Sequence, residues 1–149
     1  MTASPPITRF IGEAERTLQA LLQRQLQKAG MSFPEWVALT ILSGGQLPTE
    51  ELAQAIAGAR VVAPGSEMTL VNDLIGKELV ARGQNLSITQ RGLDVFQPLR
   101  DSVRGVTSRL VADVSSDDLA VTRRVLETLT SRAVELLRKD DTITQTRPE

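Results

Sequence analysis

The stretch that most constrains the fold runs from Pro64 to Gly92. Apolar side chains recur in its first half at spacings of three and four residues, which is the period of a helix with one face against a core. These side chains are Met68, Val71, Leu74 and Ile75. The spacing predicts a helix from about residue 68. Its outward face is then made by Ser66, Thr69, Leu70, Asp73 and Lys77.

After this helix the apolar pattern changes to two short alternating runs, 79–82 and 86–88. Only Gly83-Gln84-Asn85 separates the runs, and a connection of this length that contains glycine favours a β-hairpin. Thr89 then offers a hydroxyl group to cap a further helix. A helix, a two-stranded ribbon and a second helix, in this order, are typical of a winged helix-turn-helix, whose first helix enters the DNA major groove.

This stretch resembles the MarR family of bacterial transcriptional regulators. In that family a strand of the form G-L/W-V-x-R follows the recognition helix and leads to a helix start of the form L-T-x-x-G. Here Arg82 matches the strand arginine, and Thr89 and Gly92 match the helix start. Thr69 matches a recognition-helix threonine. The resemblance implies a mainly α protein in which long N- and C-terminal helices pair two subunits around a winged-helix module.

The rest of the chain fits this plan. Amphipathic spacing predicts a long first helix, two shorter helices before the recognition helix and two long helices after the hairpin. We therefore expect residues 1–31 to be an arm and a dimerisation helix, 32–92 the winged-helix module, 93–139 further dimerisation helices, and 140–149 a disordered tail.

Local signals place several boundaries within this plan. Ser32 and Glu35 form a capping-box pattern for the second helix, and Ser115 with the residues after it can cap the last helix. Residues 58–65 are expected to be the turn before the recognition helix. Pro98 falls inside the fifth helix, where we expect a bend or a local break.

The chain has 149 residues and contains neither cysteine nor histidine. This composition excludes disulfides, thiolate nucleophiles, Cys/His metal sites and histidine acid–base chemistry. No Gly-rich phosphate loop or paired acidic motif is present either, so we expect no enzyme activity, no catalytic residue, no cofactor and no metal. No apolar run is long enough to span a bilayer, and the N-terminus lacks a secretory signal, so we expect a cytoplasmic protein without membrane attachment.

The charge of the predicted module is unusual for a protein that approaches DNA. Between Phe33 and Gly92 there are four basic and six acidic side chains, a net charge of −2. Positive charge is the usual footprint of phosphate contacts. The family pattern also has basic residues where this chain has Leu70 and Asp73, a glycine where it has Glu78, and a longer wing with an Asp-x-Arg element.

Polar side chains and helix ends offer some compensation. Hydroxyl and amide groups can hydrogen-bond bases or phosphates, and a helix N-terminus attracts phosphate without side-chain charge. The candidate DNA-binding residues are Arg60, Ser66, Thr69, Asn72, Lys77, Arg82 and Arg91. For Lys77 and Arg82, a DNA contact and an ordinary structural role both remain open.

The resemblance also implies small lipophilic or aromatic ligands, held between the dimer helices and the winged helix. Flat side chains suit flat ligands, and the candidates are Phe10, Phe33, Trp36 and Phe96. Arg16 or Arg100 is available to face a carboxylate. The alternative is that the four aromatic residues are ordinary core.

Two functions remain open at this stage. The first is a homodimeric DNA-binding transcriptional regulator, a repressor released by a small ligand or a partner. The second is a winged-helix protein that has lost DNA reading and binds a protein partner, as an antirepressor or an adaptor. The acidic Glu67 and Asp73 on the recognition helix favour the second function, and the family arrangement favours the first.

Overall fold

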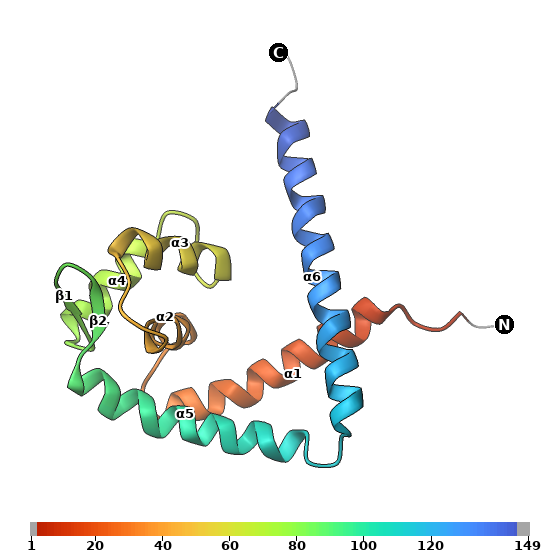
Figure 1. Cartoon of the computed structure of the whole chain (residues 1–149), viewed down its shortest axis with the longest axis horizontal. Coiled ribbons are helices and arrows are strands. Elements are labelled where there is room, and N and C mark those ends of the chain that lie inside the picture. The colour runs from red at the N-terminus through yellow and green to blue at the C-terminus, as the bar shows by residue number, and fades with distance from the viewer. Residues whose placement is uncertain (1–2, 146–149) are drawn as a thin grey trace. The chain divides into compact units, whose positions relative to one another are not determined.

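The computed structural model of the chain describes the backbone of residues 3–145 and the side chains of residues 3–141 (Figure 1). Within this range the chain forms six helices and one two-stranded antiparallel sheet. The elements are α1 (Ile7–Lys28), α2 (Phe33–Ser43), α3 (Thr49–Ala59), α4 (Glu67–Gly76), β1 (Val80–Arg82), β2 (Leu86–Ile88), α5 (Gln90–Leu110) and α6 (Ser116–Gln145). The predicted mainly α winged-helix fold with a short hairpin is confirmed. The chain divides into two compact units between Thr107 and Ser108.

Helix α2 lies at the centre of the first unit, with α1 and α5 on one side of it and α3 and α4 on the other (Figure 1). The start of α2 is fixed by the capping box that the sequence predicts. The Ser32 hydroxyl oxygen accepts from the Glu35 amide at 3.2 Å, and the Ser32 amide donates to Glu35 Oε1 at 3.1 Å. Both orphan donors at the helix start are thereby satisfied.

The core of the first unit is mainly aliphatic. Its largest fully buried side chains are Leu26, Leu39, Leu52, Ile56, Val71, Leu74, Leu86 and Phe96. They come from all five helices of the unit and from β2, so the core connects the winged-helix module to α1 and α5. Partly buried residues surround this centre, among them Phe33 and Trp36.

The buried face of α4 differs from the prediction at two positions. Leu70 is buried together with Val71 and Leu74, whereas Met68 is 38% exposed. The buried stripe is therefore centred on Leu70, Val71 and Leu74, and the helical period puts Met68 at its edge. The prediction that Leu70 faces outward is wrong, and the family's basic position is occupied here by a core residue.

The turn before α4 is also shifted. Helix α3 continues to Ala59, and Arg60 ends it with a left-handed backbone at φ 56°. The turn therefore begins two residues later than Gly58, where the sequence pattern placed it.

The hairpin has the predicted position and connection. Val80 pairs with Ile88 and Arg82 with Leu86, and the Gly83 amide donates to the Asn85 carbonyl oxygen at 3.2 Å. Leu47, in the loop between α2 and α3, exchanges two backbone hydrogen bonds with Leu86, at 3.2 and 2.7 Å. These bonds attach the hairpin to the body of the module.

The junction between α4, the hairpin and α5 is tightly packed. Glu78 has a left-handed backbone at φ 61°, at the position where the family pattern has glycine. The Thr89 hydroxyl donates to the Glu78 carbonyl oxygen at 2.6 Å and accepts from the Gly92 amide at 2.9 Å. The predicted cap by Thr89 is thus confirmed. A Cβ atom at Gly92 would collide with the Leu79 carbonyl oxygen, so only glycine fits there without displacement.

Helix α5 runs through Pro98 as one helix, so of the bend or local break that we expected there, the break is absent. Pro98 and Asp94 both lie on the exposed side of α5. The carbonyl group that loses its helical partner to proline can therefore be hydrated.

Helix α6 makes up most of the second unit. The Ser115 hydroxyl oxygen caps it by accepting from the Asp118 amide at 3.1 Å. The helix extends to Gln145, so residues 140–145 are helical although a disordered tail was expected from residue 140, while 146–149 lie outside the described residues. None of the helices in the described part of the chain has the length and apolar character needed to cross a membrane.

Candidate functional site

The exposed face of α4 carries the residues that a partner could contact. We call this surface the reader face. It is formed by Met68, Thr69, Asn72, Asp73 and Gly76. Opposite it, Leu70, Val71 and Leu74 fix α4 to the core. Ser66, immediately before the helix, is partly exposed. The structure therefore places three of the predicted DNA-binding residues, Ser66, Thr69 and Asn72, along or beside one exposed helix face.

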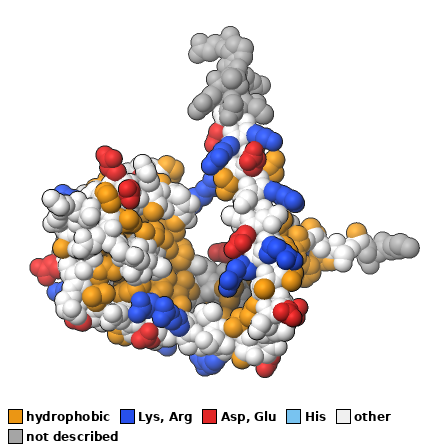
Figure 2. All heavy atoms as spheres, in the orientation of Figure 1, with side chains coloured by type: hydrophobic (Ala, Val, Ile, Leu, Met, Phe, Trp, Pro, Cys, Tyr) orange, Lys and Arg blue, Asp and Glu red, His pale blue; other side chains and the backbone are white. Residues whose placement is uncertain are grey.

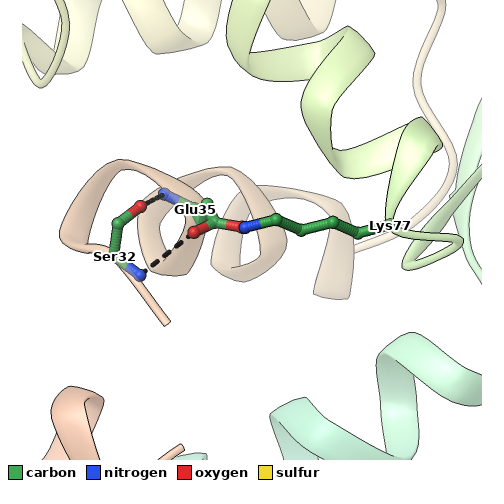
Figure 3. A network of polar contacts seen from close by, with 3 residues as sticks. All are labelled: Ser32, Glu35 and Lys77. Atoms are coloured by element: carbon green, nitrogen blue, oxygen red, sulfur yellow. Dashed lines mark hydrogen bonds and ion pairs between the residues drawn. The ribbon is translucent and has the colours of Figure 1, made fainter. Parts of the chain in front are cut away.

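Lys77 lies at the C-terminal end of α4, and its side chain contacts Glu35 of α2 (Figure 3). Its ammonium group donates to Glu35 Oε2 at 2.8 Å. Among the described residues Glu35 is the only charged one that is buried, at 7% exposure. The same carboxylate belongs to the capping box of α2, so a single group joins the start of α2 to the end of α4 (Figure 3).

The carboxyl group of Glu35 is held in its charged form. Burial opposes its ionisation, but hydrogen bonds from the Lys77 ammonium and from Ser32 outweigh burial, so the pKa of Glu35 is lowered. A buried carboxylate needs such partners, because an unpaired buried charge is strongly destabilising. Lys77 therefore has a structural role in this fold.

Arg82 lies on β1 and contacts α4. Its guanidinium donates to the side-chain oxygen of Asn72 at 3.1 Å. Both side chains are exposed, so this bond lies at the surface that joins the hairpin to the reader face. Arg82 and Asn72, both predicted DNA-binding residues, are thereby brought together.

The two remaining predicted basic residues differ in their surroundings. Arg91 forms an ion pair with Glu78 at 3.5 Å, and both side chains are more than two-thirds exposed. Such exposed pairs contribute little stability and open readily. Arg60 is exposed at the end of α3 and forms no ion pair within the described range. Lys77 and Arg91 are therefore neutralised in the first unit, whereas Arg60 retains its free charge.

Two hollows flank the Glu35 and Lys77 pair. The smaller, of about 160 Å³, also touches Met31 and Arg91, and the larger, of about 260 Å³, also touches Thr69 and Asp73. Both lie below the usual volume of ligand pockets, about 300–1,000 Å³. None of the four predicted aromatic ligand residues lines either hollow.

The aromatic residues are only partly brought together. The Trp36 and Phe96 rings lie 5.1 Å apart between centroids, and the Arg100 guanidinium carbon is 5.7 Å from the centre of the Phe96 ring. Arg100 Nε is buried and has no hydrogen-bond partner in the described structure. Phe33 is partly buried on α2, and Phe10 on α1 is 51% exposed. No ring contact joins either of them to the Trp36 and Phe96 pair in the described structure.

The described residues include no cluster of three or more acidic, cysteine or histidine side chains that could hold a metal ion. Sequence reasoning named Lys77 and Arg82 but missed their partners. Glu35 is 42 positions from Lys77, and no local signal connects them.

No protein-family model and no curated protein matches the chain. Solved structures do match over most of its length. A MarR family protein of Mycobacterium tuberculosis, Rv2887, solved in complex with DNA, is 25% identical, with a TM-score of 0.67 over 85% of this chain and 98% of that one. Ligand-free NadR is 16% identical, with a TM-score of 0.70 over 85% of this chain and 96% of that one.

The organohalide-sensing regulator RdhR, in its ligand-free form, is also 16% identical and has a TM-score of 0.70, over 87% of this chain and 80% of that one. RdhR is a transcriptional regulator, and Rv2887 is a MarR family protein. The motif residues lie where the family pattern predicts them. Arg82 is on the hairpin strand β1, and Thr89 and Gly92 are at the start of α5. In its winged-helix fold and in these motif residues, the chain is similar to proteins of the MarR family.

Proposed function

We propose that the chain is a cytoplasmic, homodimeric, DNA-binding transcriptional regulator that acts as a repressor. The observation that carries this proposal is the match to Rv2887 in complex with DNA over nearly the full length of that protein. In this proposal α4 is the helix that enters the major groove, and the hairpin is the wing.

The proposed DNA-binding residues differ in how available they are, because some already form hydrogen bonds or ion pairs within the protein. Thr69 and Ser66 make no side-chain hydrogen bond within the described range and are free to contact bases or phosphates. Arg60 is free to contact a phosphate, and Arg91 becomes free when its exposed pair with Glu78 opens. Asn72 and Arg82 act together through their hydrogen bond. Lys77 positions α4 through Glu35, and its 55% exposed side chain leaves a phosphate contact as a secondary role.

The apolar surface of the helices outside the module supports a homodimer. Helix α6 exposes many large apolar side chains, and in the view of Figure 2 hydrophobic side chains lie among charged ones along it. The exposed apolar residues of α6 are Leu119, Val121, Val125, Leu126, Val134, Leu136 and Leu137. Helix α1 adds Ile7, Phe10 and Leu18. Exposed apolar area on this scale is typical of an interaction surface, and a second copy of the chain is the partner that the family plan implies.

We also propose a small aromatic acid as the releasing ligand. Rv2887 has been solved with salicylic acid and with p-aminosalicylic acid, and NadR with 4-hydroxyphenylacetate. In this chain the partly buried Trp36 ring, packed against the buried Phe96, offers a flat apolar contact, and the partly buried Arg100 beside Phe96 is the candidate partner for a carboxylate. Phe33 is a further candidate contact, and the exposed Phe10 is more suited to the dimer surface.

The proposal is tested by selecting fragments of the source genome with the full-length chain at low salt and sequencing them. We expect enrichment of one or a few inverted repeats, with the centres of the half-sites one helical turn apart, because a twofold dimer presents two copies of α4. Thr69→Ala should reduce the enrichment, whereas Thr128→Ala, at an exposed position of α6, should leave it unchanged. Uniform recovery of the genome by a folded dimer would contradict the proposal and would direct attention to a protein partner instead.

A further inference from the structure

Lys77 and Asp73 are four residues apart on α4, a spacing at which opposite charges usually pair. In this structure Lys77 instead donates to the buried Glu35. The Asp73 side chain has no hydrogen bond or ion pair in the described part of the chain. The fold therefore leaves an uncompensated carboxylate on the reader face.

Asn72, the neighbour of Asp73 on the reader face, is oriented by the hairpin. Its side-chain oxygen accepts from Arg82, so the amide nitrogen is the part of the group that is free to bind something else. An asparagine held in this way offers hydrogen-bond donors outward, whereas an ionised aspartate offers only acceptors. The reader face therefore presents a donor group at Asn72 and an acceptor group at Asp73.

Base edges in the major groove differ in the hydrogen-bond donors and acceptors that they present to Asn72 and Asp73. Cytosine presents an amino donor, which aspartate accepts, whereas guanine presents two acceptors, which repel a carboxylate and suit a donor. A carboxylate inserted into the groove would lose its hydration without compensation at any position that lacks an amino group. A carboxylate on the reader face would thus disfavour DNA sequences that lack an amino group at the position it contacts.

Resting on the proposed DNA-binding function, we propose that Asp73 is a specificity-determining residue that reads the amino group of a cytosine in each half-site. Asn72, oriented by Arg82, donates to an acceptor such as guanine O6 or N7 on a neighbouring base pair. In this proposal the carboxylate of Asp73 on α4 makes the protein discriminate among DNA sequences.

The test is in-vitro selection from a random duplex library with the full-length wild-type chain, with Asp73→Asn and with Glu50→Gln. Glu50 is an exposed carboxylate of α3, so its variant controls for the loss of one negative charge. Wild type and Glu50→Gln should select the same C·G pair at one symmetric position. Asp73→Asn should lose this preference or shift it to A·T, since asparagine pairs with adenine, and should bind the wild-type site about 5- to 150-fold more weakly.

The outcomes separate this inference from the proposed function. If all three proteins select the same specific DNA sequence, Asp73 does not determine specificity, and the proposed DNA-binding function still stands. Absence of any selected sequence with wild type would overturn both. Arg82→Ala provides a second measurement, because it should relax the preference at the neighbouring base pair and leave the C·G preference of Asp73 in place.

Discussion

At the scale of single residues, the contact of Glu35 with Lys77 helps to hold α4 against α2. The carboxylate is buried, caps α2 and accepts from a lysine at the end of α4. The contact thus couples the start of one helix to the end of another within the module. Of the two roles that the sequence leaves open for Lys77, this contact supports the structural one.

Removing this lysine should therefore lower stability. Lys77→Ala leaves the Glu35 carboxylate buried without its charged donor, and we expect the free energy of unfolding to fall by about 1–3 kcal/mol. Urea denaturation at fixed protein concentration and neutral pH measures this loss. Arg91→Ala, which breaks an exposed pair, should change stability by less than about 0.5 kcal/mol. Equal effects of the two variants would show that the buried pair has no special role.

The same carboxyl group makes stability depend on acid. Its pKa is lowered in the folded state, so the stabilisation is fully present above the unfolded value, about 4.3, and is lost as the pH falls through the folded pKa. The comparison is between wild type and Glu35→Gln, with urea denaturation from pH 7 to pH 3. The stability advantage of wild type should shrink in the acidic part of this range. An advantage that stays constant with pH would exclude this titration as its source.

Sequence reasoning reached the identity of these residues but not their partners. The capping box of Ser32 and Glu35 is readable because its two members are three positions apart. The contact of Lys77 with Glu35 spans 42 positions, and that of Arg82 with Asn72 spans ten and crosses from strand to helix. Such contacts depend on how elements pack, which no local pattern encodes.

At the scale of elements, the junction of α4, the hairpin and α5 leaves no room for a side chain at Gly92. Gly92→Ala would place a Cβ against the Leu79 carbonyl oxygen and 2.7 Å from Ile88 Cγ2. We expect a loss of about 1–3 kcal/mol in thermal or urea unfolding, since the backbone must shift to relieve the contact. Gly58→Ala is the matched control, because its Cβ meets open space in α3 and should be neutral or stabilising by up to about 1 kcal/mol. Equal stability of the two variants would contradict this account of the junction.

Most elements were predictable because their signals are local. The long first helix, the cap of α2, the hairpin turn and the Thr89 cap all follow from spacing and cap chemistry. The burial of Leu70 in place of Met68 was not predictable. Several apolar residues of α4 fit more than one helical stripe, and packing decides which stripe is buried. Continuity through Pro98 likewise depends on which side of α5 faces water.

At the scale of the whole molecule, the proposed dimer accounts for the exposed apolar surface of α6. Leu126→Glu would place a charge among these apolar side chains and should convert the dimer to monomer at micromolar concentration. Sedimentation velocity measures the change. Ser131→Glu adds the same charge at an exposed polar position of α6 and should leave the dimer intact. A wild-type chain that sediments as a monomer would refute the proposed assembly.

We propose that this chain binds a specific DNA sequence through α4 although residues 33–92 carry a net charge of −2. The most direct measurement is fluorescence anisotropy of labelled DNA from the region upstream of its own gene against a scrambled duplex, over a series of salt concentrations. We predict specific binding that weakens as salt rises, with a log–log slope of about −4 or shallower, because few free basic residues face the DNA. At each salt concentration, Arg82→Ala and Thr69→Ala should bind the specific DNA more weakly than the wild-type chain does. Equal affinity for the scrambled duplex, or no binding by a folded dimer at low salt, would contradict the claim for that sequence.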